Sequence, residues 1–202
     1  MVTDNLSEVK LLDDMARIRT VVKACTSIRP AMNNLLSYCF KRCDSDVWKD
    51  IAKLNFEKDV EKIQHWLEKT LTGYPPPANI QAFSFGYDNP ISRGRKPDYD
   101  LYVLGATVDT MNDSDATGAL LKYDSYKPGS NEANSVVLPK IHALLFKYHL
   151  VDVGDLLLCL GYASLAVKIA FKSGDKAWLK CVDGPRPVMV GDDRGHFIFI
   201  DL

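Results

Sequence analysis

Gly73-Tyr74-Pro75-Pro76-Pro77 is the stretch that decides the fold, because it separates two parts of the chain with different hydrophobic periods. Three successive prolines exclude a helix and favour an extended polyproline II connector. Before this stretch apolar residues recur every three or four positions, and after it they first alternate. We therefore predict a single domain over residues 1–202, with a helical part at 1–72 and a mixed part at 78–202.

The helical part contains several amphipathic stripes. The first stripe consists of Leu11, Met15, Ile18, Val22 and Cys25. Pro30 suits the first turn of a second helix. A third helix contains Trp48, and helical spacing continues over residues 56–71. The sequence leaves open whether the chain breaks between these last two segments, near Asn55.

The mixed part alternates between strand and helix signals. Helical spacing predicts helices at 136–150 and 155–171. Strands are expected at 80–85, 99–108, 177–182, 188–190 and 196–202. Glycines at both ends of 191–195 indicate a hairpin turn between the last two strands. We expect an α+β fold in which the N-terminal helices pack with a small, mostly antiparallel sheet and two further helices.

Charge is distributed unevenly along the chain. The whole chain has a formal net charge of −1, whereas residues 98–132 hold seven carboxylates and two lysines. Such a surface suits a basic protein partner and repels nucleic acid. Residues 109–134 are also polar and rich in turn residues, and a loop of that length is typical of a functional segment. The alternative interpretation is a solvated loop without a partner.

Tyrosines in the same region add candidate contact residues, because tyrosine combines a large contact area with a hydroxyl and is enriched at interfaces. We predict two kinds of partner-binding residue. The acidic ones are Asp109, Asp113 and Asp115, and the aromatic ones are Tyr102, Tyr123 and Tyr126.

No strong catalytic, metal or cofactor motif is present. The five cysteines lack a Cys-x-x-Cys pair, and the four histidines lack ligand spacing beside them. No Gly-rich phosphate loop occurs. We therefore expect no cofactor, no metal and no catalytic residues. A hydrolase that uses His196 with Asp192 or Asp193 is the alternative, although a hairpin turn beside a surface or strand histidine is the favoured interpretation of these residues.

Two further expectations concern the surroundings of the protein. The N-terminus has charges in its first turns and no apolar signal segment, and the apolar run at 156–171 contains Lys168 and is short for a membrane span. A cytoplasmic protein without a membrane partner is expected. A helical adaptor is another alternative function, which exposed Leu11, Ile18 or Leu35 would support.

The second part of the chain, about 125 residues from Pro75 onward, resembles immunity proteins of bacterial polymorphic and contact-dependent toxin systems. The similar segments are 80–86 (IQAFSFG), 99–105 (YDLYVLG), 158–163 (LCLGYA) and 188–193 (VMVGDD). Gly191-Asp192-Asp193 departs from the Gly-Phe-Asp common in that group. The resemblance implies a small, cytoplasmic, non-catalytic protein that neutralises a cognate toxin by binding it, often through an acidic face when the toxin is a basic nuclease.

Overall fold

The computed structural model describes residues 3–87, 100–107, 126–129, 132–174, 176–181, 184–192 and 194–202. The helices are α1 (Thr3–Ala24), α2 (Ile28–Arg42), α3 (Val47–Ala52), α4 (Phe56–Gly73), α6 (Leu138–Lys147), α7 (Val151–Asp155) and α8 (Gly161–Ser173). A π-helical turn, η3 (Leu156–Leu160), joins α7 to α8, and η4 (Lys176–Leu179) is a 3₁₀ turn. The strands are β1 (Ala82–Tyr87), β2 (Leu101–Ala106), β3 (Lys180–Cys181), β4 (Gly184–Pro185), β5 (Val188–Asp192) and β6 (Phe197–Ile200).

Four strands form the main sheet in the order β2-β1-β5-β6. β1 pairs antiparallel with β2, β5 pairs antiparallel with β6, and the central pair β1–β5 is parallel. The register places Phe85 opposite both Val103 and Val190. The predicted α+β fold with a small, mostly antiparallel sheet is confirmed, and its one parallel pairing requires the long crossover between β1 and β5.

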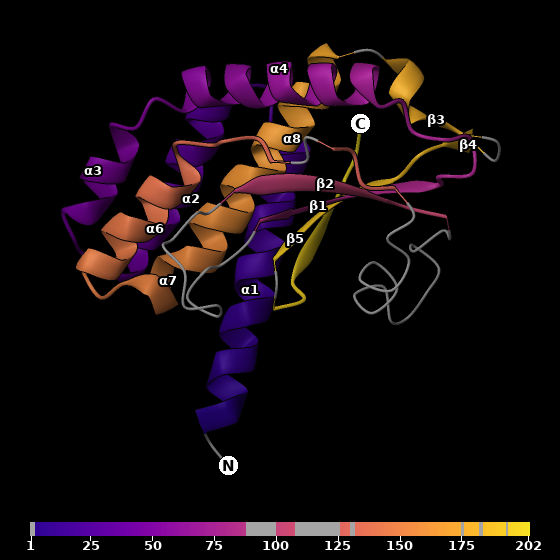
Figure 1. The fold of residues 1–202 in the computed structure, drawn as a ribbon. Coiled ribbons are helices and arrows are strands. Elements are labelled where there is room, and N and C mark those ends of the chain that lie inside the picture. Colours follow the sequence, from indigo (N-terminus) through magenta and orange to yellow (C-terminus); the bar gives the residue numbers. More distant parts are fainter. Residues whose placement is uncertain are drawn as a thin grey trace.

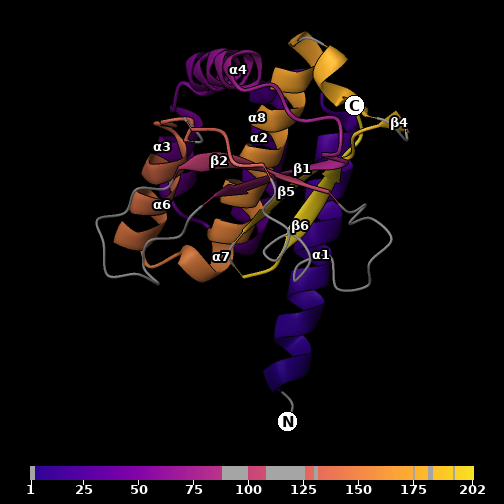
Figure 2. The ribbon, with the colours of Figure 1, turned by 45° about the vertical axis from the view of Figure 1, so that its right-hand side comes forward.

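The core lies between one face of this sheet and the helices (Figures 1 and 2). Phe171 of α8 packs against Phe83 and Phe85 of β1, with ring centroids 6.1 and 5.7 Å apart. Because successive strand residues point to opposite faces, Tyr102 and Phe199 belong to the other face of the sheet. The N-terminal turns of α1 extend past the rest of the molecule (Figure 1).

α7, η3 and α8 run on as one helical segment, Val151–Ser173, through the middle of the molecule. Among the described residues it is the one segment long and apolar enough to cross a membrane, with a mean hydropathy of 1.6. Most of its apolar window, 83%, is buried inside the protein, as in a core helix. Gly161 permits this burial, because a Cβ atom there would lie 2.5 Å from Cδ1 of Leu35 in α2.

The Pro-rich connector is held against the sheet by a buried arginine. The guanidinium of Arg186 donates hydrogen bonds to the carbonyl oxygens of Ile80 (2.7 Å), Trp178 (2.6 Å) and Pro77 (3.1 Å). Trp178 is part of the 3₁₀ turn η4, whereas the sequence predicted that a strand begins at residue 177. A strand over 177–182 is therefore wrong in its first half, and within the described part of this range Lys180–Cys181 pairs with β4.

The structure also answers the question that the sequence left open at Asn55. α3 ends at Ala52 and α4 begins at Phe56, so the chain does break there. Asn55 caps α4, because its side-chain oxygen accepts a hydrogen bond from the backbone N–H of Lys58 at 3.2 Å.

Candidate functional site

We call residues 108–125 the acidic segment. The described residues on either side of it lie at the edge of the sheet. β2 is an edge strand, and the chain returns to its free side at Tyr126 and Glu132. Gly105 and Tyr126 exchange two backbone hydrogen bonds, of 2.9 and 3.2 Å, and the N–H of Ala133 donates to the carbonyl of Leu101 at 2.8 Å. These bonds attach Tyr126 and Ala133, which follow residues 108–125 in the chain, to β2. Asp109, Asp113, Asp115 and Tyr123 lie within that segment and outside the described residues.

Tyr126 holds the end of this segment inside the protein. Its side chain packs against Phe83, its hydroxyl donates to the carbonyl oxygen of Tyr74, and only 7% of the residue is exposed. Burial raises the pKa of Tyr126 to about 12. The prediction that Tyr126 contacts a partner does not fit this placement, because the ring is already covered by the core.

Tyr102 lies on the face of the sheet that α8 does not cover. Its ring crosses Gly86 on the neighbouring strand: a Cβ atom at Gly86 would lie 2.2 Å from the Tyr102 hydroxyl oxygen. The ring is partly exposed. Of the six predicted contact residues, Tyr102 is the one that the structure describes and leaves accessible at the surface.

Asp100 faces inward rather than toward a partner. Its carboxylate accepts hydrogen bonds from the backbone N–H groups of Leu101 (3.0 Å) and Ser135 (3.3 Å). Burial raises the pKa of this carboxyl in spite of those bonds. Asp100 therefore lies within the acidic region 98–132 of the sequence. In the structure its carboxylate holds Ser135 beside the start of β2.

A second polar site joins the β5–β6 turn to helix α7. Asp192 accepts from Nε of Arg194 at 2.8 Å, and its Oδ2 lies 3.0 Å from Nδ1 of His196. Arg194 also reaches Asp155, with 3.0 Å between its Nη2 and Oδ2 of that carboxylate. The other oxygen of Asp155 lies 3.2 Å from Nδ1 of His142. We call these five residues the charged cluster.

Burial and charge decide which groups in the charged cluster are ionised. The Asp192 side chain has no exposed area, and burial opposes its ionisation. The hydrogen bond from His196 and the positive charge of Arg194 outweigh that effect, so the pKa of Asp192 lies below its ordinary value. Burial disfavours the charged form of Arg194, but the adjacent Asp192 more than compensates and raises the pKa of that guanidinium. The centre of the cluster is thus an ion pair at neutral pH.

The charged cluster contains the pair of residues that a hydrolase would need to orient a base. An Asp–His pair activates a nucleophile when the second ring nitrogen faces a hydroxyl or thiol. Cys159 is the thiol beside Asp155, and it is fully buried, with a pKa raised by burial and by the neighbouring carboxylate. A buried thiol with a raised pKa is a poor nucleophile. Asp193, the other carboxylate predicted for this role, lies outside the described residues.

Sequence reasoning found His196 and Asp192 but missed the rest of the cluster. Asp155 and His142 belong to helices that precede the turn by about 40 and 50 residues, and no spacing rule connects them to it. Among the described residues no group of three or more His, Cys, Asp and Glu side chains could hold a metal ion. The arrangement is suited to fixing the β5–β6 turn on α7.

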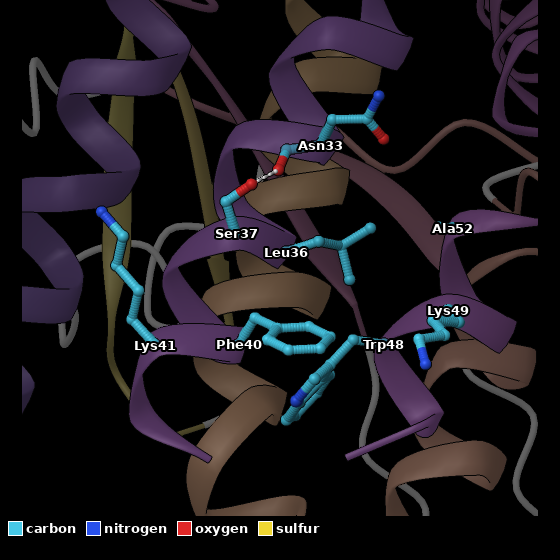
Figure 3. A pocket seen from close by; sticks show the side chains of 8 residues that line it. All are labelled: Asn33, Leu36, Ser37, Phe40, Lys41, Trp48, Lys49 and Ala52. Carbon is cyan, nitrogen blue, oxygen red and sulfur yellow. Dashed lines mark hydrogen bonds between the residues drawn. The ribbon is translucent and has the colours of Figure 1, made fainter. Parts of the chain in front are cut away.

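An open groove separates α2 from α3 on the surface (Figure 3). It has a volume of about 560 Å³ and is lined by Asn33, Leu36, Ser37, Phe40, Lys41, Trp48, Lys49 and Ala52. Trp48 forms its floor and donates its indole N–H to the carbonyl oxygen of Cys43 at 2.7 Å. Sequence reasoning placed Trp48 in a helix and gave the lining residues no binding role.

The residues on which a helical adaptor would depend are mostly in the core. Ile18 and Leu35 have no exposed area, and Leu11 is partly buried against the core.

No family model matches this chain, and neither a curated protein nor a solved structure matches it.

Proposed function

We propose that this chain is a non-catalytic binding protein of the immunity type, which acts in the cytoplasm of a bacterium and neutralises a cognate protein toxin by direct contact. The observation that carries the proposal is the pairing of Tyr126 with Gly105 at the free side of β2, since these two residues flank a stretch, 108–125, that holds four aspartates and one lysine. A charged segment whose flanking residues pair with a sheet is well placed to meet a partner, because recognition residues are commonly found on loops positioned by a scaffold.

The proposed contact is electrostatic first and aromatic second. Asp109, Asp113 and Asp115 attract lysines and arginines of the toxin and speed association. Tyr102, on the same strand as Gly105, and Tyr123 supply contact area that slows dissociation. Tyr126 keeps a supporting role, because its burial fixes the returning end of the segment. The nearly neutral chain as a whole carries no comparable attraction for nucleic acid.

A hydrolase is the second candidate, and the 3.0 Å contact between His196 and Asp192 is the observation in its favour. Two features weigh against it. Arg194 shares the Asp192 carboxylate, and a bound cation makes that carboxylate a weaker partner for a protonated imidazole. In addition, no described hydroxyl or free thiolate hydrogen-bonds the ring of His196.

The test is protection against a toxin encoded beside the gene for this chain. The chain and the toxin domain are co-expressed, and cell survival is measured together with the affinity of the purified pair. The variant Asp109→Asn/Asp113→Asn/Asp115→Asn should lose protection and lower the association rate by about tenfold at low salt. A matched control is Asp44→Asn/Glu61→Gln/Glu68→Gln, which neutralises three exposed carboxylates on the helical part and should keep both properties.

Each arm has an outcome that opposes the proposal. Binding without salt dependence, or equal loss in the two triple variants, would remove the acidic segment from the interface. Survival that depends on turnover of a substrate, with no stable complex between the chain and the toxin, would favour the hydrolase.

A further inference from the structure

We infer that the groove between α2 and α3 is a second docking site, whose occupant is an acidic amphipathic helix of another protein. The inference is independent of the proposed function, because the groove lies on the helical part and shares no residue with the acidic segment.

One wall of the groove is a continuous face of α2. Its lining residues on α2 are Asn33, Leu36, Ser37, Phe40 and Lys41, which recur at the i, i+3, i+4, i+7 and i+8 positions of one helix face. This face extends for about 12 Å, or two helical turns. α3 forms the opposite wall with Trp48, Lys49 and Ala52 (Figure 3). Two helix walls with an apolar floor form the kind of groove that binds the apolar face of a third helix.

The floor is apolar and already in place. Leu36 and Trp48 are almost fully buried, whereas Phe40 keeps 40% of its surface exposed above them. The Trp48 ring is fixed by its hydrogen bond to Cys43 and by close contact with α7, where a Cβ atom at Gly154 would lie 3.2 Å from the indole. A preformed floor lowers the entropy cost of binding. An exposed phenylalanine beside a buried tryptophan can therefore act as the centre of an interface.

The charge of the lining selects the partner. Lys41 and Lys49 line the groove, and none of its lining residues is acidic. Lys41 forms no ion pair or hydrogen bond with any residue that the structure describes. Lys49 has Asp46 as a partner at 2.8 Å, but both side chains are well exposed, so that pair is weak and a bound carboxylate can compete with it. Lys41 and Lys49 lie on opposite sides of Phe40 and Trp48 (Figure 3), so they favour a helix with leucine or phenylalanine on one face and glutamates on both sides of it.

The probe is a fluorescein-labelled peptide of about 16 residues that carries a leucine stripe flanked by glutamates, long enough to form a helix on binding. Its twin has lysines in place of the glutamates. Fluorescence anisotropy should show that the glutamate peptide binds about tenfold or more tightly than the lysine twin. The double variant Lys41→Glu/Lys49→Glu should reverse this preference, and Phe40→Ala should weaken binding of the glutamate peptide by about tenfold.

Matched controls separate the groove from the rest of the surface. Lys53→Glu changes an exposed lysine of the same region that does not line the groove, and Phe146→Ala removes another exposed phenylalanine, on α6. Both should keep the affinity within about twofold. In a ¹⁵N–¹H spectrum the indole signal of Trp48 should shift on binding, while those of Trp66 and Trp178 should not.

Three results would overturn the inference. The first is equal affinity for the two peptides, and the second is equal weakening by Lys41→Glu/Lys49→Glu and by Lys53→Glu. The third is self-association of the chain that Phe40→Ala abolishes in sedimentation measurements, since the occupant would then be a second copy.

Discussion

Asp59 and Asp192 are both buried carboxylates, yet the protein satisfies them in opposite ways. Asp59 accepts hydrogen bonds from Oγ of Ser135 (2.7 Å), the N–H of Val136 (2.8 Å) and the hydroxyl of Tyr162 (2.7 Å). No cation among the described residues pairs with Asp59. Asp192, in contrast, has its main partners within four residues along the chain, and one of them is the cation Arg194.

The difference lies in what each carboxylate holds together. The donors to Asp59 are 76 to 103 residues away in sequence, so the carboxylate joins α4 to α8 and to the start of α6. Ser135 in turn accepts a hydrogen bond at 3.2 Å from the N–H of Leu138, the first residue of α6. Asp192 stabilises a local turn, and only Arg194 extends its cluster to a distant helix. Substitution of Asp59 should therefore lower the unfolding free energy more than substitutions in the β5–β6 turn.

The largest effect is expected from Asp59→Ala. The substitution leaves two hydroxyls and one N–H buried without their acceptor, which should cost about 3–5 kcal/mol of unfolding free energy. Tyr162→Phe removes one of the three donors and should cost only about 1–2 kcal/mol. Urea unfolding followed by circular dichroism measures both. A cost below that of Tyr162→Phe would show that Asp59 is not the point where the three segments meet.

Arg194→Ala should have the next largest effect, because it removes the link between the β5–β6 turn and α7 and leaves two buried carboxylates without their cation. We expect a loss of about 2–3 kcal/mol, reduced from the value for a fully buried pair because 41% of the Arg194 side chain is exposed. The control is Lys53→Ala, which breaks an exposed ion pair with Asp50 and should cost less than about 0.5 kcal/mol. Equal losses in the two variants would mean that Arg194 pairs only at the surface.

The comparison also explains what could be predicted from the sequence. Local rules worked where the partners are local: the hairpin turn at 191–195, the helix stripes and the alternation in β1 follow from neighbouring residues. They failed for Asp59 and Asp155, whose partners come from distant segments and carry no common spacing. The same limit applies to Tyr126. Because Tyr126 lies in the acidic region 98–132, the sequence suggested an exposed contact residue. In the structure Tyr126 pairs with Gly105 and donates a hydrogen bond to Tyr74, and its ring is buried.

Asp192→Asn should sharpen the contrast through its pH dependence. At neutral pH the loss should be about 1–2 kcal/mol, because the asparagine keeps part of the turn but loses the charge-assisted bonds. The pKa of Asp192 in the folded protein lies below its ordinary value of 3.8. Its contribution is therefore fully present above that value and disappears as the pH falls through the lower pKa of the folded state. The difference in unfolding free energy between wild type and variant should shrink below about pH 4.

The buried carboxyl of Asp14 is a control, because the pH dependence of its contribution to stability should have the opposite sign. Burial raises its pKa in spite of the nearby Arg42, so the difference between wild type and Asp14→Asn should shift in favour of the wild type as the pH falls. Unfolding measured at several pH values in the two variants distinguishes these trends. Parallel trends would indicate a general acid effect rather than the ion pair in the charged cluster.

His196→Ala should have the smallest effect on stability. The ring is 23% exposed, and the bond from the backbone N–H of His196 to Asp192 survives the substitution, so the loss should be about 0.5–1 kcal/mol.

The same variant separates the two candidate functions. If the chain acts by binding, His196→Ala should protect cells against the toxin as well as the wild type does, because the residue lies in the turn and outside the proposed contact residues. If it is a hydrolase, removal of the histidine from the Asp192 pair should abolish protection while the protein stays folded, since general-base catalysis contributes a factor of about 10²–10⁴. A stable variant without protection would thus move the function from the acidic segment to the charged cluster.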